Sequence, residues 1–213
     1  LVSSSAASDV YKRQILLSAC GDEIPIEEGS EIGEYVQKII KFRQERDEQF
    51  QEGDGSPLLE KDRDGFSGLR YFPISPRFRK QLQMAVMENP DTLEIMTNDG
   101  RIRKALKYGR FSFEIDGERQ VLFALKFLDR PTSRPNHQLL VPFVDQTAGE
   151  YTYGGGRYLD LIENPMQIYD LDFNRAYNPF CAYGDDKWSC PLPPRENTPV
   201  SYTHLRAHET ATY

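Results

Sequence analysis

The spacing of hydrophobic residues changes along the chain, from a helical period at the start to a period of two from about residue 91. The first long segment carries charged residues on one helical face and apolar residues on the other, namely Val36, Ile39, Ile40 and Phe50. This spacing predicts an amphipathic helix over about residues 32–51. Ser30 provides an N-cap, and the segment EGDGSP at 52–57 ends the helix.

The strongest strand signal lies in the middle of the chain, on both sides of a two-residue turn. Phe111, Phe113 and Ile115 alternate with polar residues before Asp116-Gly117. Aspartate followed by glycine favours a tight hairpin turn, because both turn positions need a positive φ. The chain then returns with apolar residues that share one face, at Val121, Phe123, Leu125 and Phe127. This pattern predicts a β-hairpin.

Further strands are predicted on either side of this hairpin. TLEIMT (92–97) and RIRKALKYG (101–109) flank the turn signal NDG, while QLLVPFVD (138–145) and MQIYDLDF (166–173) follow the hairpin. Pro142 lacks a backbone N–H, which favours an edge position or a bulge for its strand. The sequence therefore predicts a β-rich α+β fold: an antiparallel β-barrel or sandwich-like core with one N-terminal helix.

Both ends of the chain are interpreted as translated adapter DNA. DVYKRQ (9–14) can be encoded by a DNA word whose reverse complement, read in another frame, encodes VSYTH (200–204). One word at both ends in opposite orientation is typical of a transposon adapter. Residues 1–14 and 200–213 are therefore set aside in functional reasoning, and residues 32–199 are expected to form a single β-rich domain.

The segment ILLSACGDE (15–23) has the pattern of a bacterial lipoprotein signal. A short apolar run ends in Leu-Ser-Ala, and Cys20 and polar residues follow directly. Small residues before a cleavage point are typical of secretory signals. Residues 15–20 are interpreted as a signal remnant with Cys20 as the lipidation site, and residues 21–31 as an acidic tether; the alternative is an ordinary buried segment. We expect a lipid anchor that holds the protein on the bacterial cell envelope, facing the periplasm or the exterior.

The acidic composition narrows the possible functions. The chain has 26 Lys and Arg against 33 Asp and Glu, a net charge of −7, and phosphate binding needs a positive face, so nucleic acid is not an expected partner. Of the three histidines, His204 and His208 lie in the excluded tail. Only His137 remains for a catalytic triad, and a multi-histidine metal site is ruled out. We predict no metal and no cofactor.

Potential ligand-binding residues are concentrated in the segments around 154–158 and 170–183. Asp170, Asp172 and Asn174 alternate, and would share one face of a strand. Their spacing matches the first, third and fifth positions of an EF-hand calcium loop that begins at Asp170. The sixth position is however Arg175 rather than glycine, and the twelfth position is not glutamate. An EF-hand is therefore not predicted.

A binding surface is predicted where the glycine run 154–156 meets the segment DFNRAYNPFCAY (172–183). The glycines favour a bulge or sharp bend between strands, and we expect Arg157 to pair with Asp170 or Asp172 across neighbouring strands. The predicted ligand-binding residues are Arg157, Tyr158, Asp170, Asp172, Asn174, Tyr177, Asn178 and Tyr183. Two alternatives stay open: the acids carry out acid–base chemistry, or these groups only order the loop.

Cys181 and Cys190 stand nine residues apart, on either side of Trp188. In an exported protein this arrangement favours a disulfide that closes a small loop. Two buried thiols are the alternative. A nucleophilic cysteine would need a neighbouring base, and the local sequence provides none.

Three segments carry a family resemblance: FVDQTAGEYTYGGGRYLDL (143–161), LDFNRAYNPFCAY (171–183) and WSCPLPPREN (188–197). They resemble the signature of the bacterial domain-of-unknown-function family 1684, continuously from about residue 142 to 197. The resemblance implies the domain's identity, and members that are envelope lipoproteins imply the location. It implies no reaction. It also implies a further short strand after the proline-rich segment, which adapter sequence replaces here.

We therefore predict an envelope lipoprotein whose β domain binds a small or extended ligand, or a partner, without catalysis at the Arg157–Asp172–Tyr177 surface. A histidine-independent hydrolase that uses Asp170 or Asp172 is the first alternative. A deep cleft that holds both carboxylates would favour it. A purely structural envelope protein is the second alternative.

Overall fold

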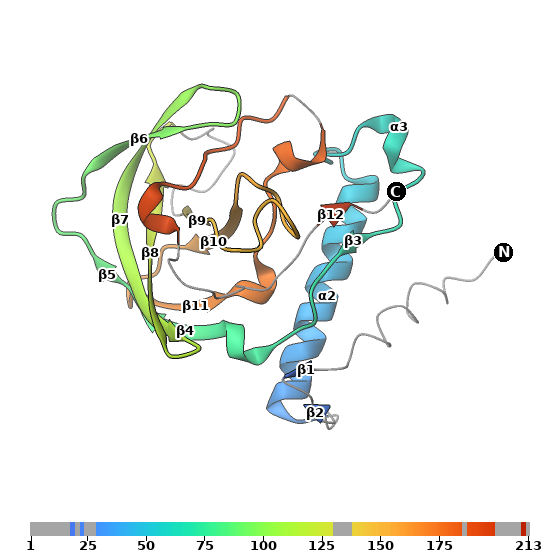
Figure 1. Cartoon of the computed structure of the whole chain (residues 1–213), viewed down its shortest axis with the longest axis horizontal. Coiled ribbons are helices and arrows are strands. Elements are labelled where there is room, and N and C mark those ends of the chain that lie inside the picture. The colour runs from blue at the N-terminus through green and yellow to red at the C-terminus, as the bar shows by residue number, and fades with distance from the viewer. Residues whose placement is uncertain are drawn as a thin grey trace.

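The protein was analysed as a computed structural model, which describes residues 29–129, 138–184 and 187–198. It also describes the backbone of three two-residue strands, β1 (Ser18–Ala19), β2 (Asp22–Glu23) and β12 (Thr210–Ala211). Cys20 and most of the predicted adapter segments lie outside these residues. Strand β12 pairs with β3 (Leu69–Arg70), although the sequence gives no strand signal at residues 210–211. The described fold is mostly antiparallel sheet, with one long helix beside it (Figure 1).

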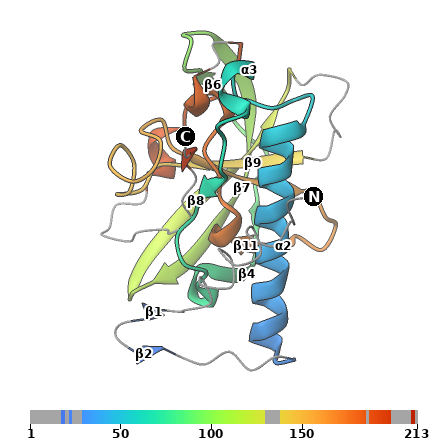
Figure 2. The same ribbon diagram turned by 90° about the vertical axis from the view of Figure 1, so that its right-hand side faces the viewer.

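Helix α2 spans Glu31–Glu52, where the apolar spacing predicts a helix over about 32–51. The Ser30 side chain accepts a hydrogen bond from the Gly33 N–H at 3.0 Å, which satisfies one of the free donors of the first turn. The buried face includes Val36, Ile39 and Phe50. Figure 2 shows the helix standing along one side of the strands. None of the helices in the described part of the chain has the length and apolar content of a membrane span.

The main sheet has the strand order β10-β9-β8-β7-β5, all antiparallel. Its longest strand, β7, pairs with β6 along its first residues and with β5 near its middle. The bounds are β5 Ala85–Val86, β6 Thr92–Met96, β7 Ile102–Ile115, β8 Glu118–Phe127, β9 Gln138–Phe143 and β10 Arg157–Ile162. Strands β4 (Arg79–Gln83) and β11 (Ile168–Asp172) form a separate antiparallel pair.

The predicted hairpin is confirmed as β7 and β8. Asp116 and Gly117 have φ values of 54° and 79°, as a tight turn between twisted strands requires. A bulge between Lys107 and Gly109 interrupts the pairing. A Cβ at Gly109 would lie 2.8 Å from the Met84 side chain and 3.1 Å from the Ala85 carbonyl oxygen of β5, so glycine suits the close approach of the chain at this bulge.

Strands β8 and β9 are buried on both faces, because residues of each belong to two different hydrophobic clusters. Phe111 and Phe113 of β7 pack with Leu122 and Ala124 of β8 in the largest cluster. Leu125 and Phe127 belong to a second cluster, together with Leu140 and Tyr158. Residues 121, 123, 125 and 127 do share one face, but this face carries the second cluster. The alternation in sequence identified the strand but not the face that meets the larger core.

Strand β9 lies inside the sheet, between β10 and β8, so the predicted edge position of Pro142 is wrong. A buried side chain replaces the pairing that proline interrupts. Asn197 donates from Nδ2 to the carbonyl oxygens of Phe123 (2.8 Å) and Pro142 (2.7 Å), and its Oδ1 accepts from the Phe123 N–H at 2.8 Å. The C-terminal segment therefore joins β8 to β9 through one asparagine.

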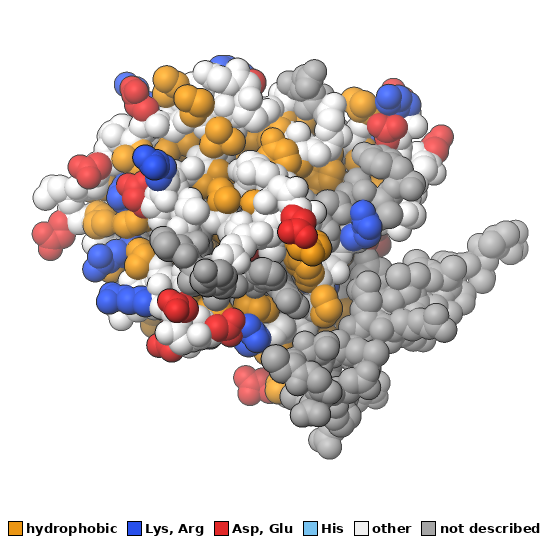
Figure 3. Space-filling view, viewed as in Figure 1, with side chains coloured by type: hydrophobic (Ala, Val, Ile, Leu, Met, Phe, Trp, Pro, Cys, Tyr) orange, Lys and Arg blue, Asp and Glu red, His pale blue; other side chains and the backbone are white. Residues whose placement is uncertain are grey.

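Between α2 and the sheet the chain forms only short elements, α3 (Glu60–Arg63), β3 and the 3-10 turn η1 (Pro76–Phe78). Pro73 and Pro76 prevent a longer element there, as the sequence predicts. After β11 come three further 3-10 turns, η2 (Phe173–Arg175), η3 (Phe180–Tyr183) and η4 (Arg195–Asn197). On the face of Figure 3, hydrophobic side chains lie at the surface among separate charged side chains of both signs.

Candidate functional site

The segment 172–183 runs along helix α2, and we call their contact the helix seam. At its start the buried Asp172 carboxylate accepts hydrogen bonds from the Tyr35 hydroxyl at 3.0 and 3.1 Å. Asn174 donates from Nδ2 to the Tyr35 hydroxyl (2.8 Å) and to the Ser75 carbonyl (2.9 Å), and its Oδ1 accepts from the Ser75 N–H. The polar side chains of this segment therefore fasten the helix to β11 and to the chain before η1.

The seam continues toward the end of the helix through arginine and aromatic contacts. The Arg175 guanidinium lies 4.6 Å from the centre of the Phe42 ring, and the Arg46 guanidinium lies 4.5 Å from the centre of the Tyr177 ring. Near the end of the helix, the Phe50 ring packs edge-on against Tyr183, with ring centres 4.8 Å apart. Helix residues 35, 42, 46 and 50 lie on one face, so the seam is a continuous structural contact.

The helix seam buries the carboxylate of Asp172. Burial raises the pKa of Asp172, against the lowering effect of hydrogen bonds from Asn174 and Tyr35. The pKa of Tyr35 is also raised, first by burial and then by Asp172. Asp170, two residues earlier on β11, instead faces the exterior and pairs with Arg79 at 2.8 Å. The two acids of the predicted catalytic pair therefore have different surroundings and different partners.

The predicted ion pair between Arg157 and Asp170 or Asp172 is wrong. Arg157 is buried and pairs with buried Asp145, with 2.8 Å between Nη2 and Oδ2. The sheet order explains this choice: Arg157 stands opposite Phe143 on β9, two residues before Asp145, whereas β11 pairs with β4. Asp145 also accepts from the Thr147 hydroxyl at 2.6 Å. We call Arg157, Asp145 and Thr147 the buried arginine network.

The glycine run forms a sharp bend before β10, as predicted. The Gly156 N–H donates to the Tyr153 carbonyl at 3.0 Å, and Gly156 has a φ of 91°. A Cβ there would lie 2.6 Å from the Phe143 carbonyl oxygen, so a side chain does not fit. Beyond the bend, Tyr158 and Tyr177 exchange backbone hydrogen bonds of 2.9 and 3.1 Å. The two motifs thus lie side by side, as the sequence predicts, although Arg157 and Asp172 point into separate buried networks.

A cleft of about 540 Å³ opens beside this pair of tyrosines, on the face of the sheet that carries the second hydrophobic cluster. Its described lining comes from α2, from β7 to β10 and from the C-terminal segment. The aromatic lining residues are Phe127, Tyr158, Tyr177, Phe180 and Trp188, and the basic ones are Arg46, Arg101 and Arg103. The carboxylates of Asp129 and Asp160 also line it. An aromatic pocket with a few charged groups is typical of small-molecule sites.

Two of the three arginines of the lining lie over aromatic rings. Arg103 lies 4.4 Å over the Phe127 ring centre and pairs with the half-exposed Asp129 at 3.0 Å. Arg46 covers the ring of Tyr177, as described for the helix seam. Arg101 pairs with Asp99 and holds the pKa of that exposed carboxyl well below its usual range. Each of these three arginines contacts a ring or a carboxylate and also lines the cleft, where a ligand can meet it.

Asp160 sits at the middle of a short hydrogen-bonded chain. Its two carboxylate oxygens accept from the Tyr177 hydroxyl at 2.6 Å and from Gln138 Nε2 at 2.8 Å. These two hydrogen bonds hold the carboxylate in position. Asp160 itself is exposed to solvent. Among the described residues, no group of three or more His, Cys, Asp or Glu side chains is placed to hold a metal ion.

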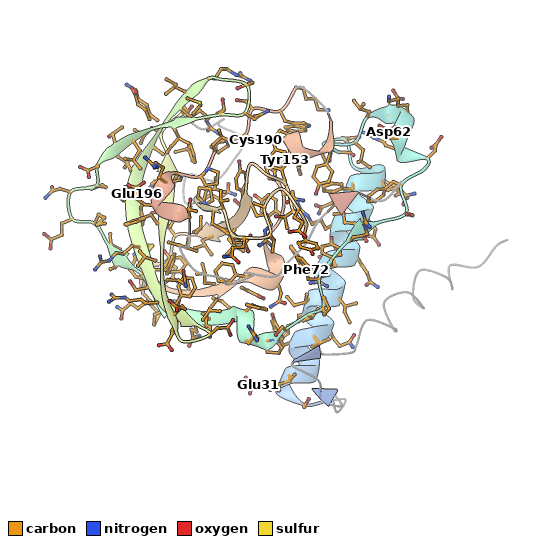
Figure 4. All side chains as sticks on the ribbon, in the orientation of Figure 1. Glu31, Asp62, Phe72, Tyr153, Cys190 and Glu196 are labelled. Atoms are coloured by element: carbon orange, nitrogen blue, oxygen red, sulfur yellow. The ribbon has the colours of Figure 1, made fainter. Side chains whose placement is uncertain are left out.

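Cys190 lines the cleft, and Cys181 lies next to it but outside the lining. Both are free thiols in this structure, which does not contain the predicted disulfide; Cys190 is buried, as the alternative of two buried thiols expects, but Cys181 is only partly buried. The Cys181 N–H points to Cys190 Sγ at 3.3 Å, and Cys181 Sγ lies 3.9 Å from the Tyr153 hydroxyl. Tyr153 and Cys190 appear close together in Figure 4. A hydrogen bond from the Cys181 thiol lowers the pKa of Cys190, and the same bond raises the pKa of Cys181.

Of the eight predicted ligand-binding residues, only Tyr158 and Tyr177 line the cleft. Asn178 is buried and accepts from the Tyr153 N–H at 3.2 Å, and Tyr183 packs on the helix. The remaining four belong to the helix seam, to the buried arginine network or to the exposed pair with Arg79. The sequence signal missed Arg46, Arg101, Arg103, Phe127, Asp160 and Trp188, which come from five separate segments and form no local motif.

Comparisons with known proteins identify the family of the domain. The family model described as "Protein of unknown function (DUF1684)" matches residues 64–200. The chain is also similar to an uncharacterized protein of Haloarcula marismortui with a solution NMR structure. The two are 35% identical, with a TM-score of 0.61, over 84% of this chain and 96% of that one. No curated protein matches the chain.

Proposed function

We propose that this chain, which belongs to the DUF1684 family of proteins of unknown function, is a non-enzymatic binding domain for a small organic anion with a flat apolar body. The observation that supports the proposal is the cleft, where three arginines and five aromatic side chains surround one open volume. The whole chain carries a net charge of −7, so this concentration of arginines is local.

The apolar part of the ligand would lie against the aromatic lining. Trp188 and Phe180 pack edge-on with ring centres 4.8 Å apart, and Tyr158 and Tyr177 pack in the same manner at 5.7 Å. These two pairs provide flat, rigid faces that lose little side-chain entropy on binding. Covering such faces with a planar ligand yields roughly 25 cal/mol for each Å² of apolar surface removed from water.

The anionic group would meet the guanidinium groups. Arg103 presents planar donors that match a carboxylate, and its present partner Asp129 is about half exposed, with 46% of its side chain accessible. A surface ion pair of this kind contributes only about 0–1 kcal/mol, so a ligand carboxylate can replace it at little cost. Within the less accessible cleft the new pair gains strength from the lower local dielectric.

The geometry gives less support to the two alternatives. A hydrolase that uses Asp170 or Asp172 needs both carboxylates in a cleft, and neither residue lines this one. Asp172 is enclosed by Tyr35 and Asn174. A purely structural role accounts for the helix seam and the buried arginine network, but it does not explain why arginines line the cleft.

We also propose a location for the domain, on the bacterial envelope and tethered through a lipid on Cys20. The lipoprotein signal pattern at residues 15–20 and the acidic segment after it support this proposed location. When cells that express the natural full-length gene product are grown with radiolabelled palmitate, the protein should become labelled. The Cys20→Ser variant should not be labelled. A wild-type product that stays unlabelled would remove the anchor from this proposal.

Trp188 provides the direct assay for binding, because it is the single tryptophan of the chain and lines the cleft. The probe is anilinonaphthalenesulfonate, a flat aromatic anion with the proposed chemistry. We expect saturable binding, seen as energy transfer from Trp188 to the probe, and a loss of affinity of about tenfold in Arg103→Ala, the scale of one charge-assisted contact.

Arg77→Ala is the matched control. Like Arg103, Arg77 stacks on a phenylalanine, with 4.7 Å to the Phe78 ring centre, and pairs with a partly exposed aspartate, Asp116. It lies outside the cleft lining. We expect this variant to bind the probe with wild-type affinity. Equal losses in both variants, or an absence of saturable binding, would contradict the proposed site.

A further inference from the structure

We propose that Cys181 and Cys190 form a reversible dithiol–disulfide pair that reacts with small disulfides through the cleft. The proposal concerns the two thiols only and holds for any ligand of the cleft. It assigns a redox role to two residues to which the binding proposed above gives no contact with the anionic group or the aromatic faces, although Cys190 lines the same cleft.

The two thiols are held against each other by separate structural elements. Cys181 lies on η3, and its N–H points to Cys190 Sγ at 3.3 Å. The backbone of Cys190 is fixed to the turn after β6: its N–H donates to Asn98 Oδ1 at 2.7 Å, and its carbonyl accepts from the Asn98 N–H at 3.0 Å. Both partners are thus held close together before any bond forms, as disulfide formation requires.

The cleft distinguishes the two cysteines. Cys190 is part of its lining, whereas Cys181 is not, so a small disulfide that enters the cleft meets Cys190, although Cys190 is the more buried of the two residues. Hydrogen bonds from the Cys181 thiol and the Cys181 N–H favour the thiolate of Cys190, which lowers its pKa. A thiolate is the attacking species in exchange, so Cys190 is the nucleophile and Cys181 the resolving thiol.

The reaction balances in two exchange steps. The Cys190 thiolate attacks one sulfur of a disulfide RSSR, the S–S bond of RSSR breaks, and one thiolate leaves and takes up a proton from solvent as RSH. Cys181 then loses its proton and attacks Cys190 Sγ of the mixed disulfide. This second step releases another RSH, so that the protein dithiol is oxidised and RSSR is reduced to two thiols.

Trp188 reports the event, because it lies in the loop that the disulfide closes. Its ring packs in the same hydrophobic cluster as both cysteines. A disulfide in contact with an indole quenches its fluorescence, so oxidation should dim the only tryptophan of the chain. The same loop supplies Trp188, Ser189 and Cys190 to the cleft, so oxidation should also stiffen this wall.

The experiment equilibrates the full chain with Cys20→Ser, which removes the third thiol, in buffers of reduced and oxidised glutathione. Samples are quenched with acid and analysed by mass spectrometry and by Trp188 fluorescence. We expect a disulfide that links Cys181 to Cys190, a matching fall in fluorescence, and full recovery of both thiols with a reducing agent. Circular dichroism confirms that the fold persists throughout.

Two variants separate the roles. Cys181→Ser should accumulate a stable glutathione adduct on Cys190, because the resolving thiol is missing. Cys190→Ser should form an adduct at least tenfold more slowly. Folded wild-type protein that keeps both thiols in oxidised glutathione would overturn the proposal. So would a disulfide that can be reduced only after unfolding, or equal adduct rates on the two single variants.

Discussion

The helix seam and the cleft use the same kinds of side chain for opposite purposes. Each combines arginine, tyrosine and aspartate, and Tyr177 takes part in both. In the seam the groups satisfy one another: Asp172 is buried and accepts from Tyr35 and Asn174. In the cleft, Arg46 and Arg103 lie over aromatic rings that line an open volume. The comparison teaches that a dense polar motif indicates a binding site only if its polar groups can still contact a ligand after they have bonded to one another.

The largest effect that this comparison predicts is in the buried arginine network. Arg157→Ala leaves the Asp145 carboxylate buried without its cation, and both side chains are only 1% exposed. We expect the free energy of unfolding to fall by about 3–5 kcal/mol. Urea unfolding followed by circular dichroism measures the change. Arg77→Ala, which removes an exposed pair, should cost less than about 1 kcal/mol; similar losses in the two variants would contradict the structural role.

The next effect is in the helix seam. Asn174→Ala removes the side-chain bonds to Ser75, Tyr35 and Asp172 and leaves buried groups unsatisfied. We expect a loss of about 2–4 kcal/mol in the free energy of unfolding, with no change in probe affinity for the molecules that stay folded. Asn89→Ala on an exposed surface is the control and should stay within about 0.5 kcal/mol of wild type. A selective loss of binding in Asn174→Ala would instead assign ligand contact to the seam.

The smallest effect is a pH dependence at Asp172. Burial raises the pKa of this carboxyl in the folded protein. The folded state then binds the proton more tightly than the unfolded chain, so the stability difference between wild type and Asp172→Asn should grow in favour of wild type as pH falls through the raised folded pKa toward the ordinary value of about 3.9. Parallel urea titrations at several pH values measure this. A constant difference, or one that shrinks on acidification, would contradict the burial of an ionisable group there.

The local patterns predicted the elements that depend on neighbouring residues alone. The Asp116-Gly117 turn fixes the β7–β8 hairpin, and the apolar face with its Ser30 cap fixes α2. The sequence did not show that β8 is buried on both faces, because alternation identifies a strand without saying what covers each side. It also missed Asn197 as the link between β8 and β9, since that contact depends on the sheet order.

The candidate site was less predictable for the same reason. The partner of Arg157 follows from the pairing of β10 with β9, which no local pattern contains. Arg46, Arg103 and Trp188 reach the cleft from segments more than fifty residues apart in the chain. Tyr158 and Tyr177 were identified because their two motifs were expected to lie side by side, and their backbones do pair.

The central claim is that ligands bind at the cleft and not at the polar motif of residues 170–174. Nitrogen-15 NMR of the full chain tests it directly during titration with anilinonaphthalenesulfonate, because Trp188 gives the single indole N–H signal. We predict the largest shifts at the Trp188 indole and at the amides of Phe127, Tyr158 and Tyr177. Shifts centred on Asp170 and Asp172, with an unchanged indole signal, would contradict it.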